Sequence, residues 1–173
     1  MIKYKNRDIF LSASVMCANW LNLKKDIDEL CRLKFDYLHI DIIDGKFAPD
    51  FTMGSSIINL LKENYDKMKF DYHFMVEEPS YLIDNSNFNK NDIVSIHQEC
   101  SRNLHRDISA LKKKNVSVGC ALSPATSLES LEYLLDDLDV VVLMTVNPGY
   151  KGQDLVPQML RKINQLRNII DKR

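Results

Sequence analysis

Short apolar runs alternate along the chain with longer segments of helical period. The runs are rich in β-branched residues, which is typical of strands, and the segments between them repeat apolar positions every three or four residues, as amphipathic helices do. The pattern predicts strands over residues 9–14, 37–43, 70–75, 92–97, 116–122 and 139–145. It predicts helices over residues 21–33, 55–65, 79–84, 101–113, 127–135 and 156–170.

Some local signals sharpen these boundaries. Ser101 and Ser127 stand where helix N-caps are expected. Pro79 suits the first turn of a helix, since its missing N–H would be unpaired there anyway. The last strand, from Val140 to Met144, is wholly apolar. This composition predicts a strand of a parallel sheet that is covered on both faces.

The alternation amounts to six βα units of roughly 25 to 30 residues, and no low-complexity linker divides them. We therefore expect residues 1–173 to form a single α/β domain. A closed (β/α)₈ barrel needs about 250 residues, or nearer 200 at the least. The pattern alone leaves two architectures open, an incomplete barrel and an open doubly wound sheet.

Composition narrows the classes of partner. The chain is 45% hydrophobic, and 23 Lys and Arg face 24 Asp and Glu for a net charge of -1. This balance gives no electrostatic case for binding nucleic acid or an anionic membrane. No apolar run approaches the roughly 20 residues of a membrane span. The polar N-terminus has no signal-type apolar stretch after it, so we expect a cytoplasmic protein.

The four cysteines are not arranged as a zinc site. No pair has the C-x-x-C spacing that structural zinc sites favour, and a cytosolic location predicts reduced thiols. The residues are Cys17, Cys31, Cys100 and Cys120.

Histidines and carboxylates gather at the ends of two predicted strands. His39 and Asp41 are two residues apart, so on a strand both side chains point to the same face. His73 ends the next strand, with Asp71 two residues before it. Imidazole and carboxylate groups are ligands for divalent metals, and His39, Asp41 and His73 would leave positions open for water or substrate. The alternative is a buried histidine bonded to an aspartate of a neighbouring strand, and Asp71 could be such a structural group.

Two loops carry glycine at the ends of strands. In residues 147–153, Gly149 and Gly152 let backbone N–H groups approach an anion closely, and Lys151 could add charge or extend into solvent. A Gly-x-x-Gly spacing alone is a weak signal for phosphate. Met75 and Met144 also end strands, where methionine usually packs into the core. We assign no catalytic role to the remaining candidates, which are His97, Glu99 and His105.

Taken together, these motifs resemble the ribulose-phosphate 3-epimerase family. The likeness runs in matching order from Ser12 to Leu166 and is carried by residues 39–45, 73–75 and 144–153. Residues 44–50 resemble the family's Asp-Gly-x-Phe-x-Pro-Asn loop, with Asp50 where Asn is usual. Within the family, residues 14–17 and 39–42 are similar to allulose-6-phosphate 3-epimerases.

The resemblance implies a (β/α)₈ TIM barrel of the ribulose-phosphate-binding type, present here with about six of its eight units. It implies an isomerase of the pentose phosphate pathway that interconverts D-ribulose 5-phosphate and D-xylulose 5-phosphate through an enediolate. It also implies homo-oligomers and one divalent metal ion, which can be zinc, iron, manganese or cobalt. By the same resemblance, Asp41 is the catalytic acid/base and His39, Asp41 and His73 are metal ligands. The substrate-binding residues would be Ser12, Met75, Met144, Gly149 and Gly152.

The chain also departs from the family pattern. The family's second catalytic aspartate lies in an Asp-Gly-Gly or Asp-Gly-Ser motif on a seventh strand, and no Asp-Gly follows Gly149 here. We therefore expect a C-terminally incomplete barrel with open edges on its first and sixth strands. Two alternatives remain open, namely an allulose-6-phosphate 3-epimerase and a truncated, inactive sugar-phosphate binding protein. A metal-free decarboxylase barrel is disfavoured, because such enzymes rely on Lys and Asp on the strands.

Overall fold

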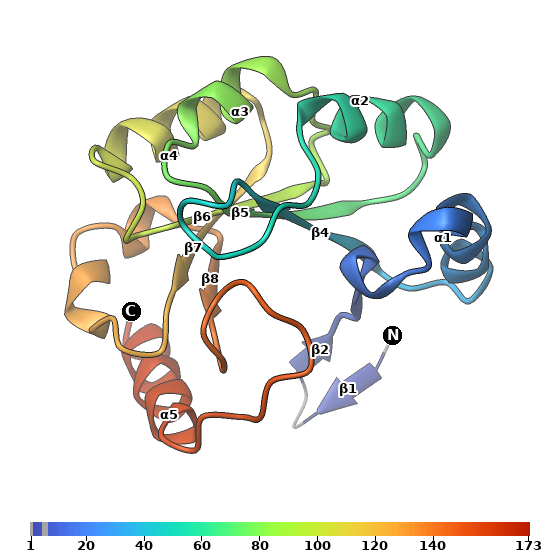
Figure 1. Ribbon diagram of the computed structural model, residues 1–173. Coiled ribbons are helices and arrows are strands. Elements are labelled where there is room, and N and C mark those ends of the chain that lie inside the picture. Colours follow the sequence, from blue (N-terminus) through green and yellow to red (C-terminus); the bar gives the residue numbers. More distant parts are fainter. Residues whose placement is uncertain (1, 5–6) are drawn as a thin grey trace.

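A computed structural model describes residues 2–4 and 7–173, and Met1, Lys5 and Asn6 lie outside it. Its centre is a six-stranded parallel sheet in which each strand pairs with the next one along the chain. Figure 1 shows this sheet curled into part of a barrel. The strand order never reverses, as it does in a doubly wound sheet, so the barrel-type architecture is confirmed. The strands are β3 (Ser12–Ser14), β4 (Tyr37–Ile43), β5 (Phe70–Met75), β6 (Ile93–His97), β7 (Ser117–Leu122) and β8 (Val140–Leu143).

Helices follow the strands on the outside of the curved sheet (Figure 1). They are α1 (Leu23–Arg32), α2 (Ser55–Asn64), α3 (Ser80–Asn85), α4 (Leu104–Lys113) and α5 (Met159–Ile170), with short 3-10 turns η1 (Val15–Cys17) and η2 (Trp20–Asn22) before α1. Because strand side chains alternate between faces, one set packs under these helices and the other points into the barrel. The main core lies on the helix side and includes Leu38, Ile40, Phe70, Tyr72 and Val94.

The segment predicted as a helix over residues 127–135 is instead two 3-10 turns, η3 (Leu128–Leu131) and η4 (Leu135–Asp137). Their backbone hydrogen bonds run from the N–H of residue i+3 to the carbonyl oxygen of residue i, as from Glu132 N–H to Glu129 O. This tighter winding brings leucines spaced three and four apart onto one small apolar cluster beside β7 and β8. Ser127 caps the first turn as predicted, since its hydroxyl accepts a hydrogen bond from the Glu129 N–H.

Other boundaries differ at element ends. Helix α4 begins at Leu104 rather than residue 101, and its N-cap residue is Asn103; the Ser101 hydroxyl accepts a hydrogen bond from the Asn103 N–H and donates one to the Asp107 carboxylate. The predicted first strand is split. Ile9 belongs to an antiparallel hairpin of β1 (Ile2–Tyr4) with β2 (Arg7–Ile9), and the barrel strand starts at Ser12. The hairpin was not predicted.

The last strand corrects a second expectation. All residues of β8 are only partly buried, although the apolar composition predicted cover on both faces. The reason is topological: β8 pairs with β7 alone, and β3 pairs with β4 alone, within the described residues. The expectation of open edges on the first and sixth barrel strands is therefore confirmed for this part of the chain.

A buried ion pair joins the helix layer to the sheet. Lys62 of α2 lies with its Nζ 2.8 Å from Asp92 Oδ2, and the two side chains are 7% and 0% exposed. Asp92 also accepts hydrogen bonds from the backbone N–H groups of Phe70 and Asn89. The carboxylate thus links α2, the start of β5 and the loop before β6 at the end of the barrel opposite the histidines.

Candidate metal centre and substrate site

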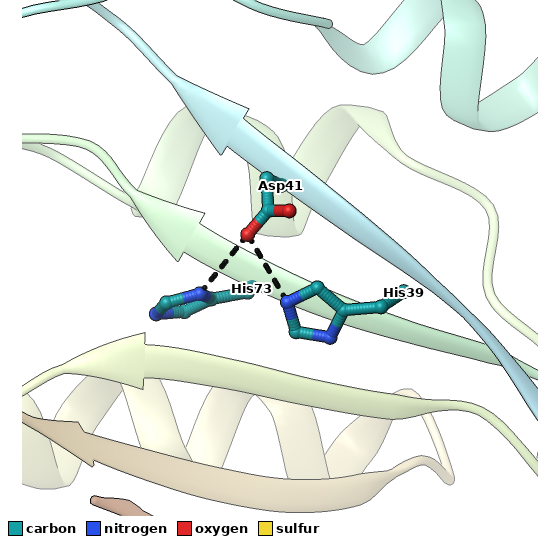
Figure 2. Close-up of side chains that lie close together, drawn as sticks. All are labelled: His39, Asp41 and His73. Carbon is teal, nitrogen blue, oxygen red and sulfur yellow. Dashed lines mark hydrogen bonds and ion pairs between the residues drawn. The ribbon is translucent and has the colours of Figure 1, made fainter. Parts of the chain in front are cut away.

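The histidines and the aspartate predicted as ligands meet at one point inside the curved sheet. His39 and Asp41 come from β4, and His73 comes from the neighbouring strand β5, where it pairs with Asp41 in the register. Figure 2 shows the two imidazole rings converging on one carboxylate oxygen. The ligand atoms of all three residues lie within 4.8 Å of one another, a grouping that could hold a metal ion.

The spacing of these atoms suits a small divalent cation. Asp41 Oδ1 lies 3.0 Å from His39 Nε2 and 3.3 Å from His73 Nδ1. Ligands at about 2.0–2.1 Å from a tetrahedral zinc ion are themselves about 3.3 Å apart. The two separations from Asp41 Oδ1 are close to this spacing, and the donor set of two imidazoles and one carboxylate fits zinc, iron, manganese or cobalt.

Further polar groups contact the candidate ligands from the side away from their point of convergence. His39 Nδ1 lies 2.7 Å from Asp71 Oδ2, so the contact between a histidine and an aspartate of the next strand also exists, alongside the ligand arrangement. The Ser12 hydroxyl donates to Asp71 Oδ2 at 2.9 Å, and the Ser14 hydroxyl donates to Asp41 Oδ2 at 2.9 Å. Ser14 rather than Ser12 is thus the serine that reaches the central carboxylate. Such outer partners fix the orientation of metal ligands.

The electrostatics of the site follow from burial and from these contacts. Burial opposes a charge on His39, but the hydrogen bonds that its ring donates to Asp41 and Asp71 outweigh this effect and raise the pKa of His39 to about 10. Burial likewise opposes ionisation of Asp41, yet its pKa lies well below the usual range, and the hydrogen bond from His39 is the largest effect that lowers it. For His73, burial is the largest effect and lowers the pKa. The site therefore combines an ionised carboxylate with a neutral, buried imidazole at His73.

A third histidine, to which the sequence assigned no role, extends this network. His97 of β6 is fully buried, and its Nε2 lies 2.8 Å from the Nε2 of His73. Its Nδ1 lies 3.0 Å from Glu99 Oε2, and the ring of Phe47 packs on it with 4.6 Å between centroids. The signal was present in the sequence, because His97 and Glu99 repeat the period-two pairing of His39 with Asp41. His105, in contrast, is exposed on α4.

The glycine loop after β8 has the backbone that its sequence predicts. Gly149 and Gly152 have φ angles of 117° and 76°, both in a region that favours glycine. The Gln153 side chain closes the loop, since its Nε2 donates to the carbonyl oxygens of Asn147 and Tyr150. Gly149 packs against the loop after β4, where an added Cβ would lie 2.8 Å from Pro49 Cδ. The two loops thus meet at the same end of the barrel as the histidines.

The two methionines occupy different surroundings. Met75 is buried beside Ile43 and Ala48, two residues beyond His73 on the inner face of β5. Met144 follows β8 and is partly buried, with its N–H bonded to Leu122 O. In the sheet order β6 and β7 separate β8 from β4 and β5, which carry His39 and His73. Their contact with substrate, like that of Ser12, Gly149 and Gly152, stays a prediction.

We expect Gly149→Ala to destabilise the loop and to weaken its binding of an anion. The new methyl group would be strained at φ 117° and would collide with Pro49. Urea unfolding should show a loss of about 2–3 kcal/mol in the free energy of unfolding, and the Kd for inorganic phosphate, the anion predicted for this loop, should rise at least about tenfold.

Gly54→Ala is the matched control, because Gly54 has an extended φ of -128° and an added Cβ there would meet no atom within 4 Å. It should change stability by less than about 1 kcal/mol. Equal effects of the two substitutions would contradict a special role for the Gly149 loop.

The fold and site together define a class: a parallel (β/α) barrel sheet with a His-Asp-His group at the carboxyl ends of its strands and a glycine loop beside it. A model of the Ribulose-phosphate 3 epimerase family matches residues 10–173. The chain belongs to the ribulose-phosphate 3-epimerase family, and the resemblance noted from its motifs is confirmed.

Curated relatives agree with the family assignment. The chain is 35% identical over 165 residues to the ribulose-phosphate 3-epimerase of Bacillus subtilis, covering 95% of this chain and 76% of the relative. It is 32% identical over 170 residues to that of Synechocystis, covering 97% and 74%. It is 32% identical over 169 residues to the chloroplastic ribulose-5-phosphate-3-epimerase of Arabidopsis thaliana, covering 96% of this chain but 60% of the relative.

None of the helices in the part of the chain that the structure describes is both long and apolar enough to cross a bilayer. The four cysteines are free thiols, with Cys100 and Cys120 buried.

Proposed function

We propose that this chain carries out proton transfer at C3 of a ketose phosphate, as part of a metal-dependent 3-epimerase that acts on D-ribulose 5-phosphate and D-xylulose 5-phosphate. The observation that carries the proposal is the convergence of His39 Nε2 and His73 Nδ1 on Asp41 Oδ1, at 3.0 Å and 3.3 Å, at the carboxyl ends of β4 and β5. Reactions in (β/α) barrels take place at this end of the strands. The family and the names of the relatives supply the reaction.

The residues divide the chemical work between the two oxygens of one carboxylate. Asp41 Oδ1 faces both imidazoles, whereas Oδ2 accepts a hydrogen bond from Ser14 and meets neither ring. Oδ2 is therefore the oxygen available to take the proton from C3, and the Ser14 hydroxyl orients it. A divalent cation held by His39, Asp41 and His73 would supply positive charge that stabilises the enediolate oxygens.

Other side chains bind and shield the sugar phosphate. The backbone N–H groups of the Gly149 loop would hold the phosphate, since Gly149 and Gly152, both at positive φ, have no side chain to keep an anion from the backbone. Buried Met75 and Ile43 form an apolar surface near the inner face of β5, which keeps water from the reacting carbon.

The test is exchange of the C3 proton with solvent. The 173-residue chain, loaded in turn with zinc, manganese, cobalt or ferrous iron, is incubated with D-ribulose 5-phosphate in D₂O, and the C3–H signal is followed by NMR. We expect metal-dependent loss of this signal. A base on one face of the enediolate can return deuterium to that same face without inversion, so deuterium in unchanged ribulose 5-phosphate also supports the proposal.

Other outcomes would overturn it. Binding of ribulose 5-phosphate without exchange under any of these metals would favour the alternative, a catalytically inactive sugar-phosphate binding protein. Faster exchange with allulose 6-phosphate than with ribulose 5-phosphate would favour a hexulose phosphate as the substrate. Residues 14–17 and 39–42 are similar to those of allulose-6-phosphate 3-epimerases. We also propose a homo-oligomer, which light scattering of the chain would test.

A further inference from the structure

We propose that His97 and Glu99 are positioning residues that hold His73 in the tautomer whose Nδ1 is free to bind a metal. The inference rests on the metal site of the proposed function and adds residues that touch neither metal nor substrate. Its basis is a continuous line of polar contacts, from Glu99 to His97, from His97 to His73 and from His73 to Asp41.

The direction of the hydrogen bonds in this line is set at Glu99. Its Oε1 accepts from the Ser123 backbone N–H at 2.7 Å and from the Thr126 hydroxyl, and its Oε2 faces His97 Nδ1. Burial opposes ionisation, but these hydrogen bonds outweigh it and lower the pKa of Glu99 to about 2. An ionised carboxylate can only accept, so the proton of this contact resides on His97 Nδ1.

That choice propagates to the next ring. A neutral imidazole has one donor and one acceptor nitrogen, so His97 with a proton on Nδ1 presents a lone pair at Nε2. Among the described residues, the partner that this lone pair meets at 2.8 Å is the Nε2 of His73, which must then carry its proton. His97 is fully buried, and an unpaired ring nitrogen there would be costly.

The consequence appears on the far side of His73. With its proton on Nε2, the ring turns a lone pair at Nδ1 toward Asp41 Oδ1, which is itself an acceptor. Figure 2 shows this nitrogen facing the carboxylate while the other points away. The separation of 3.3 Å is longer than the 3.0 Å between the same oxygen and His39 Nε2. Two acceptors that face each other attract a cation between them, so the line of contacts keeps His73 ready as a ligand.

The other candidate histidine ligand, His39, also has a carboxylate beside its Nδ1. Asp71 faces the Nδ1 of His39 at 2.7 Å, as Glu99 faces the Nδ1 of His97. His39 thus has a carboxylate directly behind it, whereas His73 reaches its carboxylate through a second imidazole. Outer partners of this kind alter metal affinity by about 10–100-fold when they are removed.

The experiment compares His97→Phe with the unaltered chain. Phenylalanine keeps an aromatic ring beside Phe47 but offers no acceptor to His73. The ¹⁵N shifts of His73 in the metal-free protein should show the proton on Nε2 in the unaltered chain, and on Nδ1, bonded to Asp41, in the variant. The Kd for zinc, measured by competition with a chromophoric chelator, should rise about 10–100-fold in the variant.

Controls separate positioning from structure. His105→Phe makes the same change at an exposed histidine of α4 and should leave both readouts unaltered. Thr126→Val removes one hydrogen bond of Glu99 without touching its contact with His97, so the tautomer should persist. Glu99→Gln retains an oxygen that can accept from His97 and should rescue zinc affinity relative to Glu99→Leu.

The inference and the proposed function can fail separately. A proton on Nδ1 of His73 in the unaltered, metal-free chain would overturn the inference, and so would a zinc Kd in His97→Phe within twofold of the unaltered chain. Failure of the unaltered chain to exchange C3–H would instead count against the proposed function, and it would leave the tautomer result intact.

Discussion

Replacing Asp41 by Asn is expected to abolish tight metal binding and C3 proton exchange. The carboxylate is the meeting point of His39 and His73 and the one oxygen ligand of the group. Asn keeps the shape but removes the negative charge that attracts a divalent cation. The metal Kd should rise by more than about 100-fold, beyond the effect of losing an outer partner, and exchange should fall by about 10²–10⁴-fold because the base is lost.

Asp66→Asn is the matched control for this variant. Asp66 is an exposed carboxylate in the segment between α2 and β5, at the opposite end of the strands from the site. It should leave zinc affinity and exchange unaltered. Circular dichroism should confirm that both variants fold. Zinc affinity within a few-fold of the unaltered chain in Asp41→Asn would show that the group of His39, Asp41 and His73 is not the metal site.

Asp92→Ala is expected to produce the largest loss of stability. The substitution leaves the Lys62 ammonium, whose side chain is 7% exposed, without its partner, and it frees the backbone N–H groups of Phe70 and Asn89. Breaking one side of a buried ion pair costs about 3–5 kcal/mol. Urea unfolding followed by circular dichroism should show a loss of this size in the free energy of unfolding.

Two further variants test the reason for this loss. Lys62→Met should destabilise the chain less than Asp92→Ala, because Asp92 keeps two backbone donors after the ammonium is removed. Lys24→Met breaks the exposed pair of Lys24 with Asp28 and should change stability by less than about 1 kcal/mol. A loss in Asp92→Ala as small as in Lys24→Met would mean that the buried pair contributes little.

Strands inside the sheet were predicted more accurately than strands at its edges. Strands β4 and β5 have the predicted bounds to the residue, since both lie inside the sheet with a strand on each side and an apolar face under helices. The edge strands were predicted less well. β3 is shorter than the strand predicted over residues 9–14. β8 consists wholly of apolar residues but is only partly buried. Apolar composition reports what a strand can be packed against, and not whether a neighbour is present.

The candidate site divides in the same way. Period-two spacing placed His39 with Asp41 and Asp71 with His73 on shared faces, and this needed only the geometry of a single strand. Which serine reaches Asp41 depends on the register between β3 and β4, where Ser14 pairs with His39. The contact of His97 with His73 depends on neighbouring strands and on two ring orientations. A linear pattern contains neither piece of information.

The sequence by itself therefore determined the βα rhythm, the family and the three residues that converge as candidate ligands, because these follow from local periodicity and from motifs of adjacent residues. Only the tertiary structure decided which edges stay open, how residues 127–135 wind and how Glu99 and His97 connect to His73. Those features depend on contacts between strands, and such contacts are fixed by register and packing rather than by the order of residues along one segment.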